Sequence, residues 1–146
     1  MVINSKDKGK RWEREAAKIL NKSFPNVWTR IPLSGALGTV LEMPSLKADL
    51  IGEYYFLKNP IMAEAKYGYG GSSMTIKKEW FDKIRIAAEE TYSLPVVLLK
   101  FDNARSGVRY VIALDFEAWD EMMSDVERMH TELLNFYEQY ENEKSS

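Results

Sequence analysis

The stretch ADLIGEYYFLKNPIMAEAKY, residues 48–67, decides the fold of this chain. Both of its flanks are rich in β-branched, aromatic and apolar residues, and Asn59-Pro60 between them is a turn signal. The pattern predicts two strands joined by a turn, the first over residues 48–57 and the second over residues 61–67. We expect the remaining elements of the chain to pack around this hairpin.

Three charged residues stand within these otherwise apolar strands. Side chains alternate along a strand, so Glu64 and Lys66 share one face, and the hairpin would bring Asp49 onto the strand beside Glu64. Buried charges are costly unless they are paired or bind a metal, and neighbouring carboxylates repel each other. Mg²⁺, which is often held by one or two carboxylates, removes that repulsion. The hairpin alone leaves two interpretations open: a metal site, or an Asp at a strand entrance with a Glu–Lys pair on a solvated face.

Length and composition place the chain among ordinary globular proteins. Its 146 residues predict one domain, 1–146, and its 45% hydrophobic and 29% charged residues are typical of a soluble protein. The absence of cysteine excludes disulfides and cysteine-based zinc sites, and the single His130 excludes a His-rich metal site. No apolar run has the length of a membrane span and no signal peptide is visible. We therefore expect a cytoplasmic protein without a membrane partner, and the small size suits a phage or microbial source.

The net charge of −2 conceals an uneven distribution. From Ala113 to the C-terminus, ten acidic residues face only Arg128 and Lys144, so that segment carries −8 and the preceding 112 residues carry +6. A basic body with an acidic tail is compatible with an anionic partner such as nucleic acid.

The N-terminal region predicts a helix from about Ser5 or Asp7 to Lys22. Its apolar residues recur at helical spacing, and Glu13 lies beside that stripe rather than opposite it. Glu13 is therefore either an inward-facing acid or a boundary residue paired with a nearby Arg or Lys. The basic residues within 1–11 fit either an arm that contacts phosphates or a solvated terminus.

A strand over residues 26–31 and a long glycine-containing loop over 32–47 lead into Asp49. Arg30 and Ser34 are placed to meet a ligand near Asp49, although a surface Arg and a turn Ser would have the same pattern. After Lys66, the glycines and tyrosines of residues 67–73 indicate a flexible segment, which serves either to approach a phosphate chain or as a plain linker.

The second half predicts a helix over about 75–91, strands over 94–101 and 108–114, and a last helix over about 115–143. The last helix carries an apolar seam with alternating spacings of three and four, a heptad pattern with acidic residues around it. Such a helix either packs on the body or pairs with a partner chain. The seam residues are Trp119, Met122, Val126, Met129, Leu133, Phe136 and Tyr140.

With Glu13 on the first helix, Asp49 at the second strand and Glu64-Ala65-Lys66 on the third, the chain resembles the PD-(D/E)XK nuclease superfamily. Lys8-Gly9 before Glu13-Arg14, Arg30 before Ser34-Gly35, and the run Ile61–Lys66 resemble the archaeal-type Holliday junction resolvases. The resemblance covers about residues 8–114, with Ala48 in place of the family's proline and Trp80 where relatives often carry a polar residue.

The resemblance implies an α/β, restriction-endonuclease-like core: a mixed sheet of about five strands flanked by helices, here followed by the long C-terminal helix. It implies that Asp49, Glu64 and the Ala65 carbonyl ligate Mg²⁺, with Mn²⁺ as a substitute, and that Glu13 completes the site directly or through a water. Lys66 would orient or activate the attacking water, and Ser34 would bind phosphate near the cut.

By the same resemblance we expect a homodimeric, structure-selective endonuclease that resolves four-way DNA junctions by paired symmetric nicks leaving 5′-phosphates. Phosphate contacts are expected from Lys8, Lys10, Arg11, Arg30, Lys77 and Lys78. The alternatives are a restriction- or mismatch-type nuclease of the same superfamily, an inactive DNA-binding module, and a non-enzymatic interaction protein that uses the C-terminal heptads.

Overall fold

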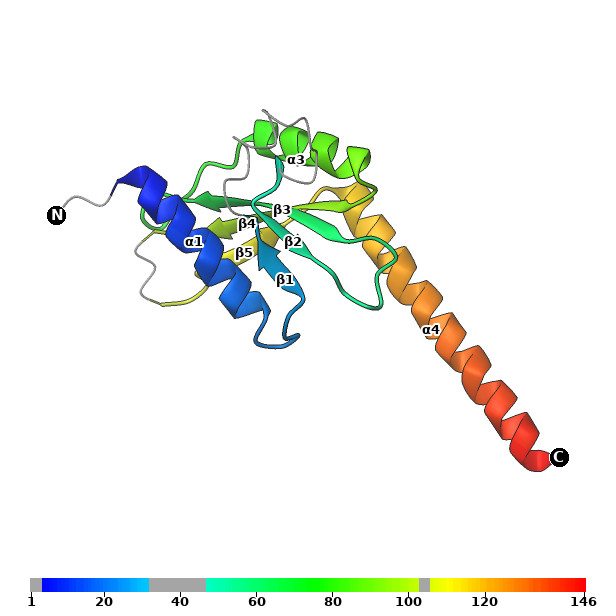
Figure 1. Ribbon diagram of the computed structural model, residues 1–146. Coiled ribbons are helices and arrows are strands. Elements are labelled where there is room, and N and C mark those ends of the chain that lie inside the picture. Colours follow the sequence, from blue (N-terminus) through cyan, green and yellow to red (C-terminus); the bar gives the residue numbers. More distant parts are fainter. Residues whose placement is uncertain (1–3, 32–46, 103–105) are drawn as a thin grey trace.

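The computed structural model describes residues 4–31, 47–102 and 106–146 (Figure 1). This part of the chain forms five strands and three helices. In chain order they are α1 (Ser5–Leu20), β1 (Trp28–Arg30), β2 (Leu50–Gly52), β3 (Ile61–Tyr67), α3 (Lys78–Glu90), β4 (Leu94–Lys100), β5 (Tyr110–Ala113) and α4 (Phe116–Ser145).

The five strands form one mixed sheet in the order β1-β2-β3-β4-β5. β3 is antiparallel to β2 and parallel to β4. The edge strands β1 and β5 are antiparallel to their neighbours, β2 and β4. The parallel step follows from α3, which connects β3 to β4 as a crossover helix. β3 is therefore central, and it carries Glu64 and Lys66.

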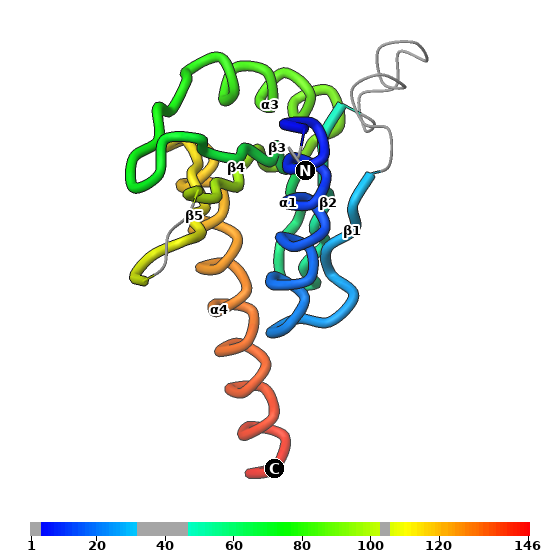
Figure 2. The backbone as a smooth tube through the Cα atoms, turned by 90° about the vertical axis from the view of Figure 1, so that its left-hand side faces the viewer, coloured from blue at the N-terminus to red at the C-terminus, as the bar shows by residue number. Residues whose placement is uncertain are grey.

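Helices cover the two faces of the sheet (Figure 2). The buried stripe of α1, which includes Trp12 and Ala16, packs in one core with Leu50 and Ala63. Ile84 and Ala88 of α3 pack in the other core, on the face that carries Met62. Because side chains alternate along β3, Glu64 and Lys66 lie on the same face as Met62, toward α3.

These observations confirm the expected fold class, a five-stranded mixed sheet flanked by helices with a long C-terminal helix. The prediction for the second strand is wrong in length, because β2 ends at Gly52. A side chain at that position would come within 2.7 Å of the Trp28 indole. Beyond it, the Glu53 N–H still donates to the Val27 carbonyl at 3.0 Å, and Tyr54 and Phe56 then pack in an aromatic cluster with Phe24 in place of strand pairing.

The predicted helix start is confirmed, because α1 begins at Ser5. Asn4 caps α1 by accepting the Lys6 N–H at 3.2 Å, so the basic residues that follow lie on a helix. At the other end of the sheet, α3 begins only at Lys78, later than the sequence predicts.

α4 leaves the body after its first turns (Figure 1). The side chain of Asp115, the residue before α4, caps the helix by accepting the Ala118 N–H at 2.8 Å. It also accepts the Nε–H of Arg85 from α3 at 2.8 Å. Met122 packs against the core beside α1, and Asp125 accepts the Lys58 N–H at 3.0 Å. Ala118 is the only buried residue of the helix, so body packing accounts for the start of the apolar seam and not for the rest.

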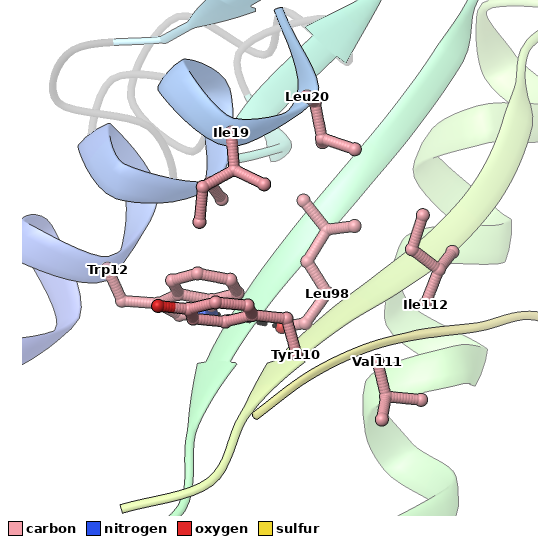
Figure 3. A pocket seen from close by; sticks show the side chains of 8 residues that line it. Trp12, Ile19, Leu20, Leu98, Tyr110, Val111 and Ile112 are labelled. Atoms are coloured by element: carbon pink, nitrogen blue, oxygen red, sulfur yellow. Dashed lines mark hydrogen bonds between the residues drawn. The ribbon is translucent and has the colours of Figure 1, made fainter. Parts of the chain in front are cut away.

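An apolar hollow of about 190 Å³ lies between α1 and the β4–β5 edge (Figure 3). The rings of Trp12 and Tyr110 stack on each other at one side of it, with centroids 5.3 Å apart and planes inclined by 8°. No charged side chain lines it, so its chemistry is that of packing. Among the described residues, no helix is long and apolar enough to cross a membrane.

Candidate active site

The register between β2 and β3 sets Asp49 beside Glu64. Leu50 pairs with Ala63 in the antiparallel ladder, so the next opposed positions are Asp49 and Glu64. The Asp49 N–H donates to the Ala63 carbonyl at 2.9 Å, and its Oδ2 accepts the Ala65 N–H at 2.8 Å. This second bond holds the carboxylate against the edge of β3. Because the N–H and C=O of a strand residue point the same way, the Ala65 carbonyl faces the same edge.

Glu64 is the buried acid of the site, with only 3% of its surface exposed. Its Oε1 accepts Lys66 Nζ at 2.8 Å and Lys83 Nζ at 3.3 Å. Its Oε2 is buried and has no hydrogen-bond partner within the described part of the chain. A buried carboxylate oxygen without a donor is unfavourable, and a bound cation would relieve it.

α3 supplies two residues whose place in the site the sequence did not reveal. Lys83 reaches Glu64, as described, and the Trp80 ring lies 5.5 Å from Lys66 Nζ, at cation–π distance. The two residues are three positions apart on α3, so they lie on one helix face. The sequence spacing of Trp80 and Lys83 indicates that they share a helix face. Only the position of α3 over β3 shows that they contact Lys66 and Glu64.

Glu13 is engaged elsewhere. Its Oε2 accepts Arg30 Nε at 2.7 Å, and both side chains are largely buried. The neighbouring Trp12 packs with Ala63 in the core opposite to that of Met62. Among the residues that the structure describes, no three Asp, Glu, His or Cys side chains are grouped so as to hold a metal. The assignment of Glu13 to the metal site therefore stays a prediction, and Ser34 lies outside the described residues.

Two carboxylates and a carbonyl are nevertheless a fitting donor set for Mg²⁺. This ion prefers oxygen ligands and is commonly held by one or two carboxylates with waters completing the shell. Asp49, Glu64 and the Ala65 carbonyl supply such oxygens at one strand edge, and the orphaned Oε2 of Glu64 is the observation that favours a cation there.

A cleft of about 510 Å³ opens beside Lys66. The turn that borders it depends on glycine: a side chain at Gly70 would come within 2.6 Å of the Ser73 carbonyl oxygen, and Gly71 has φ +68°. The walls combine glycines, aromatic rings and lysines, which suits a nucleic-acid backbone with its sugars. The lining residues include Gly9, Ala65, Lys66, Tyr67, Gly68, Tyr69, Thr75, Lys77 and Trp80.

The residues predicted to bind DNA fall into two groups. Lys77 lines the cleft and has its ammonium 3.9 Å from Glu79, and Lys8 places its ammonium over the Tyr67 and Tyr69 rings at 5.7 and 5.5 Å. Arg30 and Lys78 are instead paired with Glu13 and Asp82 at 2.7 Å each. Lys10 and Arg11 lie on α1, half-buried and exposed respectively.

A cluster around Lys100 supports the end of β3 behind the cleft. The Lys100 ammonium binds the Glu15 carboxylate and lies within 6 Å of the Trp12, Tyr67 and Tyr110 rings. Burial raises the pKa of Glu15, but hydrogen bonds from Lys100 and Tyr110 outweigh it and hold the pKa below its ordinary value.

The same cluster fixes Tyr67. The Tyr67 hydroxyl donates to Asp102 at 2.6 Å, and this bond, together with burial, raises the pKa of Tyr67 to about 12. The residue after Lys66 is thereby fixed in place, so the cluster positions the end of β3.

Comparison with known proteins identifies the family of the chain. A family model described as "Phage putative PDDEXK endonuclease" matches residues 4–145, so the chain belongs to this family of PD-(D/E)XK endonucleases. It is also similar to Protein D14 of Escherichia phage T5, with 28% identity over 127 residues, which cover 79% of this chain and 73% of that protein. The family match extends through α4, so the long helix is part of the matched sequence.

Proposed function

We propose that this protein is a Mg²⁺-dependent, structure-selective DNA endonuclease that resolves four-way junctions by paired symmetric nicks leaving 5′-phosphates. The observation that carries the proposal is the Glu64 carboxylate, buried beside Lys66 with one oxygen unsatisfied and Asp49 on the neighbouring strand. Membership of the PD-(D/E)XK endonucleases supports the nuclease chemistry, and nucleases of this superfamily generally use divalent metals.

Asp49, Glu64 and the Ala65 carbonyl would hold the metal. A bound Mg²⁺ would polarise the scissile phosphate and make hydroxide available near neutral pH. The protein's part is to fix these oxygens in advance: the Ala65 N–H restrains Asp49, and burial in the sheet restrains Glu64. Glu13, whose Oε2 accepts Arg30 Nε, would complete the site directly or through a water.

Lys66 would act on the phosphate itself. Its ammonium lies 2.8 Å from Glu64 and stands at the mouth of the cleft, where it can hold the attacking water and stabilise negative charge on the phosphoryl group. Lys83 would keep Glu64 paired when Lys66 turns toward the phosphate, since both ammonium groups contact the same oxygen. Ser34 is proposed to bind phosphate near the cut.

The DNA would approach along the cleft that begins at Lys66. Lys8 and Lys77 stand beside this cleft, and Lys10 and Arg11 continue the positive charge along α1. Arg30 and Lys78 would add phosphate contacts by exchanging their carboxylate partners for phosphate. Such contacts bind DNA without reading its sequence, which suits an enzyme that selects a branched shape. Two cuts related by symmetry require two active sites, hence a homodimer with C2 symmetry.

The test is a cleavage assay with Mg²⁺ on a four-way junction and on a linear duplex of matched sequence. We expect symmetric nicks in the junction alone, no cutting in EDTA, and a loss of at least about 100-fold in rate for Lys66→Ala. Lys18→Ala, which changes an exposed lysine on α1 away from the site, serves as the matched control and should cut normally.

Each result separates one part of the proposal. Equal cutting of duplex and junction would keep the nuclease and remove junction selectivity, leaving a restriction- or mismatch-type enzyme of the same superfamily. Binding of junctions without cutting by the folded protein, in Mg²⁺ or Mn²⁺, would leave a DNA-binding module. Unchanged cutting by Lys66→Ala would overturn the assigned chemistry.

A further inference from the structure

The distal half of α4 has no protein against it. Every residue from His130 to Ser146 is exposed, and the helix runs straight out from the body (Figure 1). At 1.5 Å per residue, the part from His130 to Ser145 spans about 24 Å. A helix of this length usually depends on packing of its apolar face for stability, so an uncovered face calls for an occupant.

The exposed face of this segment is apolar at heptad spacing. Val126, Met129, Leu133, Phe136 and Tyr140 continue the seam that starts on the body. Leu133 is 49% exposed, Phe136 61% and Tyr140 46%. Written as a heptad, these residues occupy the a and d positions, which meet across a two-stranded coiled coil.

The residues flanking the seam indicate what covers it. On one flank, the g positions hold Glu132 and Gln139; on the other, the e positions hold Tyr137 and Lys144. In a parallel pair of identical helices, each g residue meets the e residue five positions later in the partner. Glu132, whose Oε1 also accepts Arg128 Nη1 of its own helix at 3.1 Å, then faces a tyrosine hydroxyl. Gln139 faces an ammonium, so each acceptor meets a donor.

The antiparallel arrangement is less favourable. It brings g positions against g positions, and in the register that opposes Val126 to Phe136 of the partner, Glu132 meets its own copy. A further g residue, Asp125, is already bound by the Lys58 N–H and Arg128, so it contributes little to either arrangement. The complementary flanks therefore favour a second copy of this chain in parallel.

We propose that residues 126–140 of α4 form a parallel two-stranded coiled coil with a second copy of the chain. Both catalytic bodies then lie at the same end of the coil, related by a twofold axis along it. The coiled coil itself is inferred from the exposed seam of α4 and its flanking residues. Its link to paired cutting rests on the proposed function, for which this interface would supply the dimer.

The first test compares two neighbouring leucines. Leu133 lies on the seam and Leu134 beside it, with 49% and 50% of their surfaces exposed, so a charge at either is equally solvated in a free helix. Sedimentation of the full chain without DNA or metal should give twice the 16.9 kDa chain mass for the wild type and Leu134→Glu, and the single mass for Leu133→Glu. A monomeric wild type, or a dimeric Leu133→Glu, would overturn the proposal.

The second test reads the direction of the helices. The chain has no cysteine, so a single introduced one reports its own contacts. Phe136→Cys should form a disulfide with its own copy on mild oxidation, because d meets d in a parallel coil, whereas Glu138→Cys on the outer face should not. A disulfide that forms only when Val126→Cys and Phe136→Cys chains are mixed would show an antiparallel pair and reject the parallel assignment.

Activity then separates this inference from the proposed function. Leu133→Glu should still nick junction strands in Mg²⁺ but lose the coincident second nick. If no variant cuts DNA while the wild type is dimeric and Leu133→Glu monomeric, the proposed function fails and the interface stands. If Leu133→Glu makes both cuts together as a monomer, the interface has no part in resolution.

Discussion

At the residue scale, the site depends on how the buried Glu64 carboxylate is paired inside the sheet. A buried carboxylate is costly unless it is paired, and here Lys66 and Lys83 both contact one of its oxygens. The arrangement is redundant: replacing Lys66 leaves Lys83 as a partner 3.3 Å away. Loss of activity in Lys66→Ala would therefore reflect chemistry and not unfolding.

Trp80 is a positioning residue for Lys66 by this geometry. Trp80→Leu removes the ring 5.5 Å from the Lys66 ammonium, and we expect kcat for cleavage to fall about 10-fold while KM for DNA changes little. Trp80→Phe keeps a ring and should retain most of the activity. Phe81→Leu, a half-buried neighbour on α3 that faces the core, is the control for packing alone. Equal losses of kcat in Trp80→Leu and Phe81→Leu would contradict the assignment.

At the element scale, the sequence predicted the order of helices and strands and placed Asp49 on the strand beside Glu64, while the register between the two strands comes from the structure. Those features depend on local alternation and a short connection, which are readable from neighbouring residues. The length of β2 was not predictable, because its end is set by contact between Gly52 and Trp28, which are far apart in sequence. The partners of Glu13 and Lys83 depend in the same way on how α1 and α3 settle on the sheet.

The attachment of α4 is testable at this scale. The hydrogen bond from Arg85 holds the pKa of Asp115 below its ordinary value of 3.8, despite partial burial. A lowered folded-state pKa means stability that is present above the unfolded-state pKa and lost as the pH falls through the folded-state value. Asp115→Asn keeps a capping side chain but loses the charge, so we expect about 1 kcal/mol lower stability near neutral pH.

Urea unfolding at a series of pH values checks this expectation. The difference between wild type and Asp115→Asn should shrink as the pH falls below 3.8, because the wild-type carboxylate is then progressively protonated. Asp120→Asn, an exposed acid in the next turn of α4, should show no such difference. A pH-independent effect of Asp115→Asn would point to capping alone and not to the Arg85 pair.

At the scale of the whole molecule, charge divides the protein into a basic body and an acidic shaft. The first 112 residues carry +6 and the segment from Ala113 carries −8. α4 projects away from the body, so much of the negative charge is held apart from the proposed DNA cleft (Figure 1). An overall pI of 5.6 would conceal this separation.

The salt dependence of DNA binding should follow this division. Affinity that rests on phosphate contacts falls linearly on a log–log plot against salt, and each lost contact lowers the slope by about 1. We expect this change for Lys77→Ala, whose side chain lines the cleft, measured by fluorescence anisotropy with a labelled junction. Lys144→Ala, near the far end of α4, should leave the slope unchanged. Equal slopes for Lys77→Ala and wild type would remove Lys77 from the DNA interface.

The separation of charge also bears on the rate at which the protein finds DNA. A molecule that is positive at one end and negative at the other turns in the field of the phosphate backbone before contact. Collisions in which the acidic α4 approaches the DNA first are repelled, and those in which the basic body approaches first are attracted. A larger share of collisions is therefore productive. The acidic helix thus contributes to capture without touching the DNA, through the orientation in which the protein arrives.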